Sequence, residues 1–205
     1  MSAMTETEWL NCTDPDPMLE YLRNKASDRK LRLFACACAR GIWDLLEDER
    51  PRQAVQVAER YADGLAIEQD LSAASDRAWE AIDANRAEAN YAARATVESF
   101  AYAAAEDAAH AASQENGSAA LKAHCALLRD IFGNPLRVAT IDPSWQTREI
   151  VTFAQTVYEQ RAFAKIPMLG DALKQGGCTN PDILAHCHQP AVHVPGCWVV
   201  DLVLG

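Results

Sequence analysis

The chain has 205 residues and a formal net charge of −10, and hydrophobic residues make up 49% of it. A length of this order fits one domain that buries a sufficient core without additional stabilising cross-links. An acidic chain repels phosphate backbones and anionic lipids, so we expect no direct binding to nucleic acid. No run of about 18 uncharged apolar residues occurs, so we expect no membrane span.

The N-terminal residues indicate the compartment and the first element. Residues 1–8 lack the basic and apolar regions of a signal peptide, and the seven cysteines are an odd number. We therefore expect reduced thiols and a cytoplasmic location. Residues 1–16 are predicted to form an extended N-terminal arm, because the alternation of aspartate and proline over residues 14–17 indicates a turn.

Helices are predicted next over residues 18–24, 28–47 and 51–64. Ser27 or Asp28 is a typical N-cap for the second of these helices. Pro51 suits the first position of the third helix, and Gly64 is a typical residue at its end.

The stretch 65–116 contains neither glycine nor proline, and 19 of its 52 residues are alanine, the strongest helix former. It is predicted to be one very long helix or two helices end to end. A single helix would run to roughly 75 Å, longer than a compact domain of this size, so a bend or break is expected near residues 83–89. Ten acidic and only three basic residues make this stretch strongly negative.

Further helices are predicted over residues 119–132, 147–162 and 167–175, with an irregular connection at 133–145. Asn180 and Pro181 supply a cap and a first-turn proline for a short helix that ends near Cys187. Residues 196–205 are apolar and β-branched, and their pattern fits either a short buried helix or a strand.

These elements predict an all-α protein, an irregular multi-helix bundle built around the long alanine-rich helix or helix pair. We expect a single helical domain over residues 1–205, because no internal repeat and no clear boundary occur. Residues 176–205 would be a tail that contains cysteine and histidine and packs on the bundle.

This tail holds the densest group of metal-ligand side chains in the chain. Zinc takes four cysteine or histidine ligands, so the group suggests a zinc site that fixes the tail to the helices. No C-x2-C or H-x3-H pair occurs, however, and neighbours such as His186 and Cys187 point about 100° apart on a helix. The alternative is buried thiols with histidines that cap helices or face water. The residues predicted as metal ligands are Cys178, His186, Cys187, His193 and Cys197.

No enzyme signature occurs: there is no G-x-S-x-G, P-loop, Rossmann glycine pattern or H-E-x-x-H. Catalytic residues and an organic cofactor are therefore not predicted. An enzyme of unrecognised class stays an alternative, with His124, His186 or His193 as an acid or base.

Several segments resemble an uncharacterised family of planctomycete proteins. They are TETEWLNCTDP from Thr5, MLEYLRNKASDRKLRLFAC from Met18, LLRDIFGNP from Leu127, DILAHC from Asp182 and HVPGCWVVDL from His193. The resemblance spans most of the chain and implies no particular activity, cofactor or substrate. The family has a Gly-Pro-Gly-like turn where this chain has residues 188–191, which implies no metal role for His188.

The leading functional hypothesis is a cytoplasmic helical interaction module, a scaffold or regulatory adaptor. Its acidic helix would present a surface to a basic protein partner or pair with a second copy of the chain. The second hypothesis is a module stabilised by zinc through its C-terminal cysteines and histidines.

Overall fold

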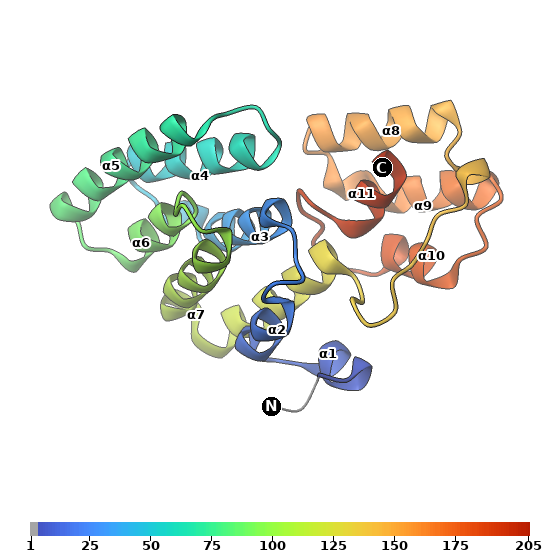
Figure 1. The fold of residues 1–205 in the computed structure, drawn as a ribbon, viewed down its shortest axis with the longest axis horizontal. Coiled ribbons are helices and arrows are strands. Elements are labelled where there is room, and N and C mark those ends of the chain that lie inside the picture. Colours follow the sequence, from blue (N-terminus) through green and yellow to red (C-terminus); the bar gives the residue numbers. More distant parts are fainter. Residues whose placement is uncertain (1–3) are drawn as a thin grey trace. The chain divides into compact units, whose positions relative to one another are not determined.

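The computed structural model describes residues 4–205, apart from the side chains of residues 115 and 116. Within these residues every regular element is a helix and no strand occurs, so the predicted all-α class is confirmed (Figure 1). The chain divides into two compact units, unit 1 up to residue 128 and unit 2 from residue 129. A single domain over residues 1–205 stays a prediction, since it concerns how these two units fold together.

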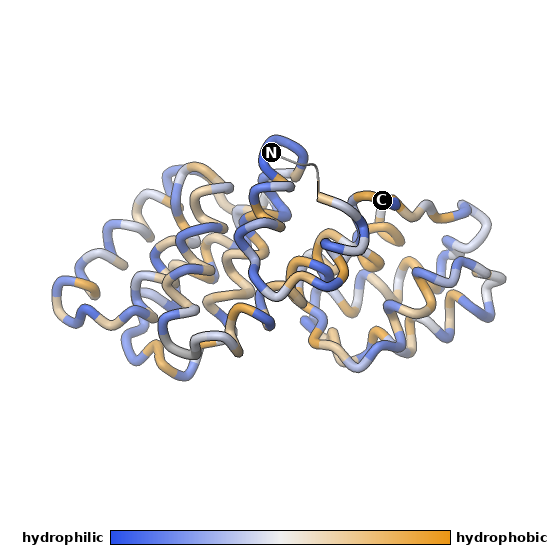
Figure 2. Tube along the Cα trace, turned by 90° about the horizontal axis from the view of Figure 1, so that it is seen from below, coloured by the Kyte–Doolittle hydropathy of each residue, from blue (hydrophilic) through white to orange (hydrophobic). Residues whose placement is uncertain are grey.

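Residues 4–128, the described part of unit 1, form seven α-helices, the last of which continues into unit 2. Hydrophobic and hydrophilic residues alternate along these helices, as expected where one side of each helix is buried (Figure 2). No described helix is both long and apolar enough to cross a bilayer. The elements are α1 (Glu6–Asn11), α2 (Pro15–Leu22), α3 (Asp28–Arg40), the 3-10 helix η1 (Trp43–Leu45), α4 (Glu49–Ala62), α5 (Glu68–Ala84), α6 (Glu88–Ala95) and α7 (Ala101–Phe132).

The prediction of an extended N-terminal arm over residues 1–16 is wrong for the described residues 4–16, because α1 and the start of α2 lie there. Thr5 accepts a hydrogen bond from the backbone of Glu8, whose carboxylate in turn accepts from the backbone of Thr5. This reciprocal capping box starts α1. Trp9 is fully buried and attaches the short helix to the rest of unit 1.

The alanine-rich stretch forms three helices rather than one or two. The predicted break near residues 83–89 is confirmed, because α5 ends at Ala84 and α6 begins at Glu88. A second break, over residues 96–100, was not predicted. There the buried guanidinium of Arg32 on α3 donates to the carbonyls of Thr96 (2.7 Å) and Ser99 (3.3 Å). These carbonyls are satisfied by a distant side chain, so α6 ends without glycine or proline.

The centre of unit 1 is α3, whose residues from Leu31 to Ala39 are all buried. It packs against α4 and α6, and α4 packs in turn against α5. The helix α7 is kinked at Gly117, which has a φ of 53°, and most of its alanines before the kink are buried too. The core is therefore organised around α3, and the alanine-rich helices cover it.

Unit 2 contains the last turn of α7, four further α-helices and two 3-10 helices around a separate core. The C-terminal segment, which fitted either a helix or a strand, is helical. The elements are η2 (Pro143–Trp145), α8 (Arg148–Glu159), η3 (Phe163–Lys165), α9 (Ile166–Gln175), α10 (Pro181–His188) and α11 (Trp198–Leu204). The core of this unit includes Leu169, Leu173, Ile183, Val199 and Val200, all fully buried. It also includes the cysteines of the predicted tail, so the tail is an integral part of unit 2.

Candidate metal centre

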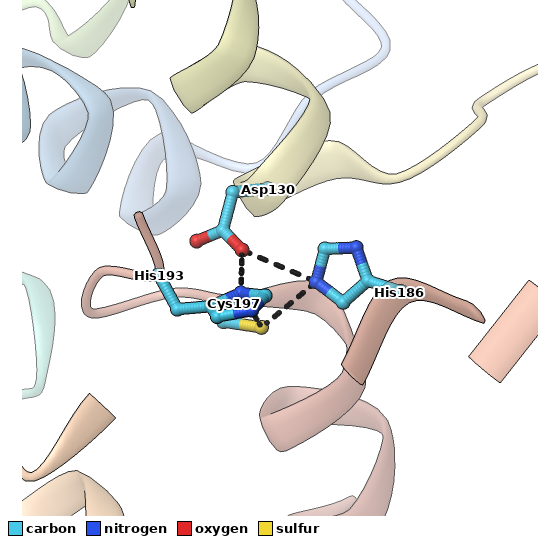
Figure 3. Close-up of side chains that lie close together, drawn as sticks. All are labelled: Asp130, His186, His193 and Cys197. Carbon is cyan, nitrogen blue, oxygen red and sulfur yellow. Dashed lines mark hydrogen bonds and ion pairs between the residues drawn. The ribbon is translucent and has the colours of Figure 1, made fainter. Parts of the chain in front are cut away.

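Four side chains of metal-ligand type come together in unit 2: Asp130, His186, His193 and Cys197 (Figure 3). One ligand atom of each lies within 4.8 Å of the other three, and all four side chains are buried. Asp130 comes from the last turn of α7 and His186 from α10. His193 lies on the segment between α10 and α11, and Cys197 immediately precedes α11.

The distances between these atoms are close to those of a tetrahedral site. His186 Nε2 lies 3.1 Å from Asp130 Oδ1 and 3.3 Å from Cys197 Sγ. His193 Nδ1 lies 2.6 Å from the same carboxylate oxygen and 3.9 Å from the same sulfur. Zinc bonds of ~2.0–2.3 Å give tetrahedral edges of ~3.3–3.8 Å. Of the two sulfur distances, 3.3 Å lies at the lower end of this range and 3.9 Å lies just above it, and the carboxylate would move outward by several tenths of an ångström to accept an ion.

Local sequence explains how the ligands reach one point. Asn180 caps α10 by accepting from the amides of residues 182 and 183, which fixes where His186 emerges. Asp130 Oδ2 accepts from the backbone N–H of Val194 at 2.9 Å, which holds the segment of His193 against α7. Gly196 has a φ of 88°, a left-handed conformation that lets the chain turn just before Cys197.

The electrostatics of the group depend on its charge balance. Burial alone would raise the pKa of Asp130, but hydrogen bonds and charges from His186 and His193 outweigh it and hold this pKa below its usual value. Burial raises the pKa of Cys197 well above its usual value, and the negative charge of Asp130 adds to this effect. With protein groups alone, Cys197 is therefore a neutral thiol. A cation placed among these atoms would favour the thiolate.

A cysteine–histidine–aspartate relay for catalysis fits this geometry poorly. In such a relay the acid and the nucleophile face opposite nitrogens of one imidazole. Here His186 directs the same nitrogen, Nε2, at both the carboxylate and the sulfur, and His193 does the same with Nδ1. Cys197 is also fully buried. The four atoms thus converge on a common centre, as metal ligands do.

The structure brings together three of the five predicted ligands, His186, His193 and Cys197, and leaves Cys178 and Cys187 outside the group. Cys187 points toward α9, where its Cβ faces Gly170. The pKa of the Cys187 thiol is raised to about 12, mainly by burial and then by Cys178. Both residues are therefore buried thiols of the core, which for Cys187 is the alternative stated above.

Asp130 was not predicted because it lies 56 residues before His186 in the sequence. One local signal does point to it. Asp130 lies between Leu128 and Ile131, which are both fully buried on α7. A carboxylate at such a position requires buried partners, although the sequence does not identify them.

The remaining histidines lie elsewhere. His188 is exposed, and its two ring nitrogens contact Asp171 (3.1 Å) and the carbonyl of Leu184 (2.8 Å). His124 belongs to unit 1 and is buried. His110 on α7 is exposed, and none of these three histidines joins the four-residue group.

Comparison of the chain with protein-family models, with curated proteins and with solved structures gives no match. The resemblance to a planctomycete family therefore stays a prediction, and the functional argument depends on the geometry of unit 2.

Gly170→Ala should destabilise unit 2 by about 1–3 kcal/mol, because it over-packs the contact between α9 and α10. A Cβ at Gly170 would lie 2.6 Å from Cys187 Cβ and 2.7 Å from His188 Cε1, so the two helices would have to separate. Urea unfolding followed by circular dichroism measures the change.

Gly176→Ala is the matched control for this substitution. Its added Cβ would meet the flexible tip of Ile150 at 2.9 Å and otherwise only ordinary contacts. We expect it to unfold close to the wild type. Equal stability of the two variants would show that α9 and α10 are not in close contact at Gly170.

Proposed function

We propose that unit 2 is a zinc-stabilised helical module in which Asp130, His186, His193 and Cys197 are the four ligands. The observation that carries this proposal is the convergence of four buried ligand atoms within 4.8 Å of one another. Convergence of this kind, from four separate positions along the chain, is the arrangement that a tetrahedral ion requires.

The donor set favours zinc over other common ions. Thiolate and imidazole ligands suit zinc, whereas magnesium and calcium prefer oxygen ligands alone. One carboxylate and one thiolate also balance the charge of a divalent ion, which matters in a buried site. Four protein ligands leave no position for a substrate or water, so the proposed role of the ion is structural.

The ion would connect three parts of unit 2: the end of α7, the helix α10 and the segment that leads into α11. Unit 2 has 77 residues, so apart from the four ligands its hydrophobic core is small. A single core in a domain of this size rarely supplies more than about 3–5 kcal/mol of stability, so a bound ion would add appreciably to it. Stabilisation of unit 2 is therefore the physical contribution that we assign to the ion.

The test is elemental analysis of the full chain, purified without a polyhistidine tag and without chelators. We expect about one zinc per chain, since a structural site should be nearly full. Cys197→Ala and Cys187→Ala form a matched pair, because both cysteines are fully buried in the same core. The first substitution should abolish zinc binding and the second should preserve it. Less than ~0.2 zinc per wild-type chain would end the proposal.

The adaptor function expected from the sequence is a second proposal, and the distribution of charge supports it. Residues 1–128 hold 22 acidic and 13 basic residues, whereas residues 129–205 hold 7 and 6. Nearly all the net negative charge thus belongs to unit 1, which favours a basic protein partner. Light scattering and a pull-down test it, and a monomer that retains no partner would count against it.

A further inference from the structure

The four proposed ligands differ in how well their surroundings support them. Asp130 is held through its second oxygen, Oδ2, by the amide of Val194. His186 is held through its second nitrogen, Nδ1, which lies 3.0 Å from the side-chain amide of Gln189. With Nε2 on an ion, Nδ1 carries the proton, and the Gln189 side chain, whose amide nitrogen lies nearest to Nδ1, turns its amide over so that the oxygen accepts.

His193 lacks such support. Its second nitrogen, Nε2, is buried and has no hydrogen-bond partner among the residues that the structure describes. Its contact with Asp130 Oδ1 uses Nδ1, the nitrogen that would bind the ion, so this contact cannot hold the ring once an ion is present. Cys197, in contrast, has the nearby amides of Val199 and Val200, which act to lower the pKa of its thiol.

The backbone around His193 is also the least regular of the four. Asp130 and His186 lie within α7 and α10, and Cys197 is the residue before α11. His193 follows an irregular segment in which Pro190, Ala191 and Val192 are exposed. Displacing residues 190–192 would unfold no helix, although the hydrogen bond from the Val194 amide to Asp130 Oδ2 holds the residue that follows His193.

From this asymmetry we propose that His193 is the exchangeable ligand of the zinc site, and that a neutral nitrogen donor of the imidazole class can take its place. This inference rests on the proposed zinc site. In the exchange, the bond from His193 Nδ1 to zinc breaks and a bond from the incoming nitrogen forms. Both donors are neutral lone pairs, so the charge of the site does not change and no electron is transferred.

His193→Ala and His186→Ala test the proposal, because the first deletes an imidazole that lacks a supporting hydrogen bond and the second deletes one that has such a bond. The full chain is loaded with Co²⁺, whose visible bands report coordination, and competition with Zn²⁺ gives the affinity. A hydrogen-bond partner that supports a metal ligand contributes about 10- to 100-fold to the metal affinity. We expect His193→Ala to bind at least about tenfold more tightly than His186→Ala. Imidazole should restore the wild-type cobalt spectrum of His193→Ala only.

The outcomes separate the two proposals. If the wild-type chain binds neither Co²⁺ nor Zn²⁺, the proposed zinc site itself is refuted. A wild-type chain that binds zinc, with equal losses in the two variants or with the greater loss in His193→Ala, overturns only the order of the ligands.

A measurement on the wild type guards against variants that fail to fold. Exchange of the imidazole C2 proton for deuterium, read by mass spectrometry, is slowed in a histidine that stays on the metal. In the zinc-loaded chain His193 should exchange faster than His186. Equal exchange of the two rings would also overturn the proposal.

Discussion

Asp130→Asn is expected to remove zinc from the chain and to destabilise unit 2 by at least about 3–5 kcal/mol, the usual effect of deleting one partner from a buried charged group. The carboxamide is a weak zinc ligand and leaves the charge of the ion uncompensated. It also leaves the imidazoles of His186 and His193 without the anion that now accepts from them. Zinc content and urea unfolding of the same preparation measure the two effects together.

Asp171→Asn is the control for Asp130→Asn. It makes the same change in unit 2 at a carboxylate that is 65% exposed, and both zinc content and stability should stay near the wild type. Wild type treated with a chelator separates the ion from the hydrogen bonds, since it keeps Asp130 but lacks metal. If Asp130→Asn keeps its zinc, Asp130 is not a ligand.

The sequence predicts helix ends well where the signal is local. Asn180 and Pro181 were expected to begin a helix, and α10 begins there with the Asn180 cap in place. Ser27 likewise caps α3. Such caps act within a few residues of their own position, so a single sequence contains what is needed to find them.

The break at residues 96–100 could not be predicted in this way. The residue that stabilises it, Arg32, is 64 residues away from Thr96 and lies on another helix. Alanine-rich sequence favours a continuous helix on either side, and the tertiary hydrogen bonds from the guanidinium to the carbonyls help to offset that preference.

The candidate site follows the same rule. His186, His193 and Cys197 are close in sequence and were predicted together, whereas Asp130 joins them only through the fold. The choice between Cys187 and Cys197 also needed coordinates. Neighbours on a helix point in different directions, and whether His186 or Cys187 faces the group depends on the rotation of α10 against α9.

Unit 1 contains a buried histidine whose effect should appear as acid sensitivity. His124 is 4% exposed and meets the ring of Phe34 edge to face, at 6.4 Å between centroids. Its Nδ1 is buried without a hydrogen-bond partner among the described residues. Burial lowers the pKa of His124 from 6.5 to about 4. The folded chain therefore keeps this imidazole neutral under conditions in which the unfolded chain protonates it.

His124→Gln should remove the acid sensitivity that this histidine causes. Above pH 6.5 the imidazole is neutral in both states, so its contribution to stability is complete. As the pH falls from 6.5 to about 4, only the unfolded state gains the proton, and the free energy of unfolding decreases. At about 1.4 kcal/mol per unit of pKa difference, the loss reaches ~3 kcal/mol near pH 4. Urea unfolding across this range should give a shallower dependence on pH for the variant.

The comparison is made against His110→Gln, which places the same amide at an exposed histidine of the same helix. The other ionisable groups are common to all three proteins, so their effects cancel in the differences between them. Parallel pH profiles for wild type and His124→Gln would show that His124 is protonated in the folded state as readily as in the unfolded state. Water would then reach Nδ1, and the packing of His124 against Phe34 would be looser than the buried contact described above.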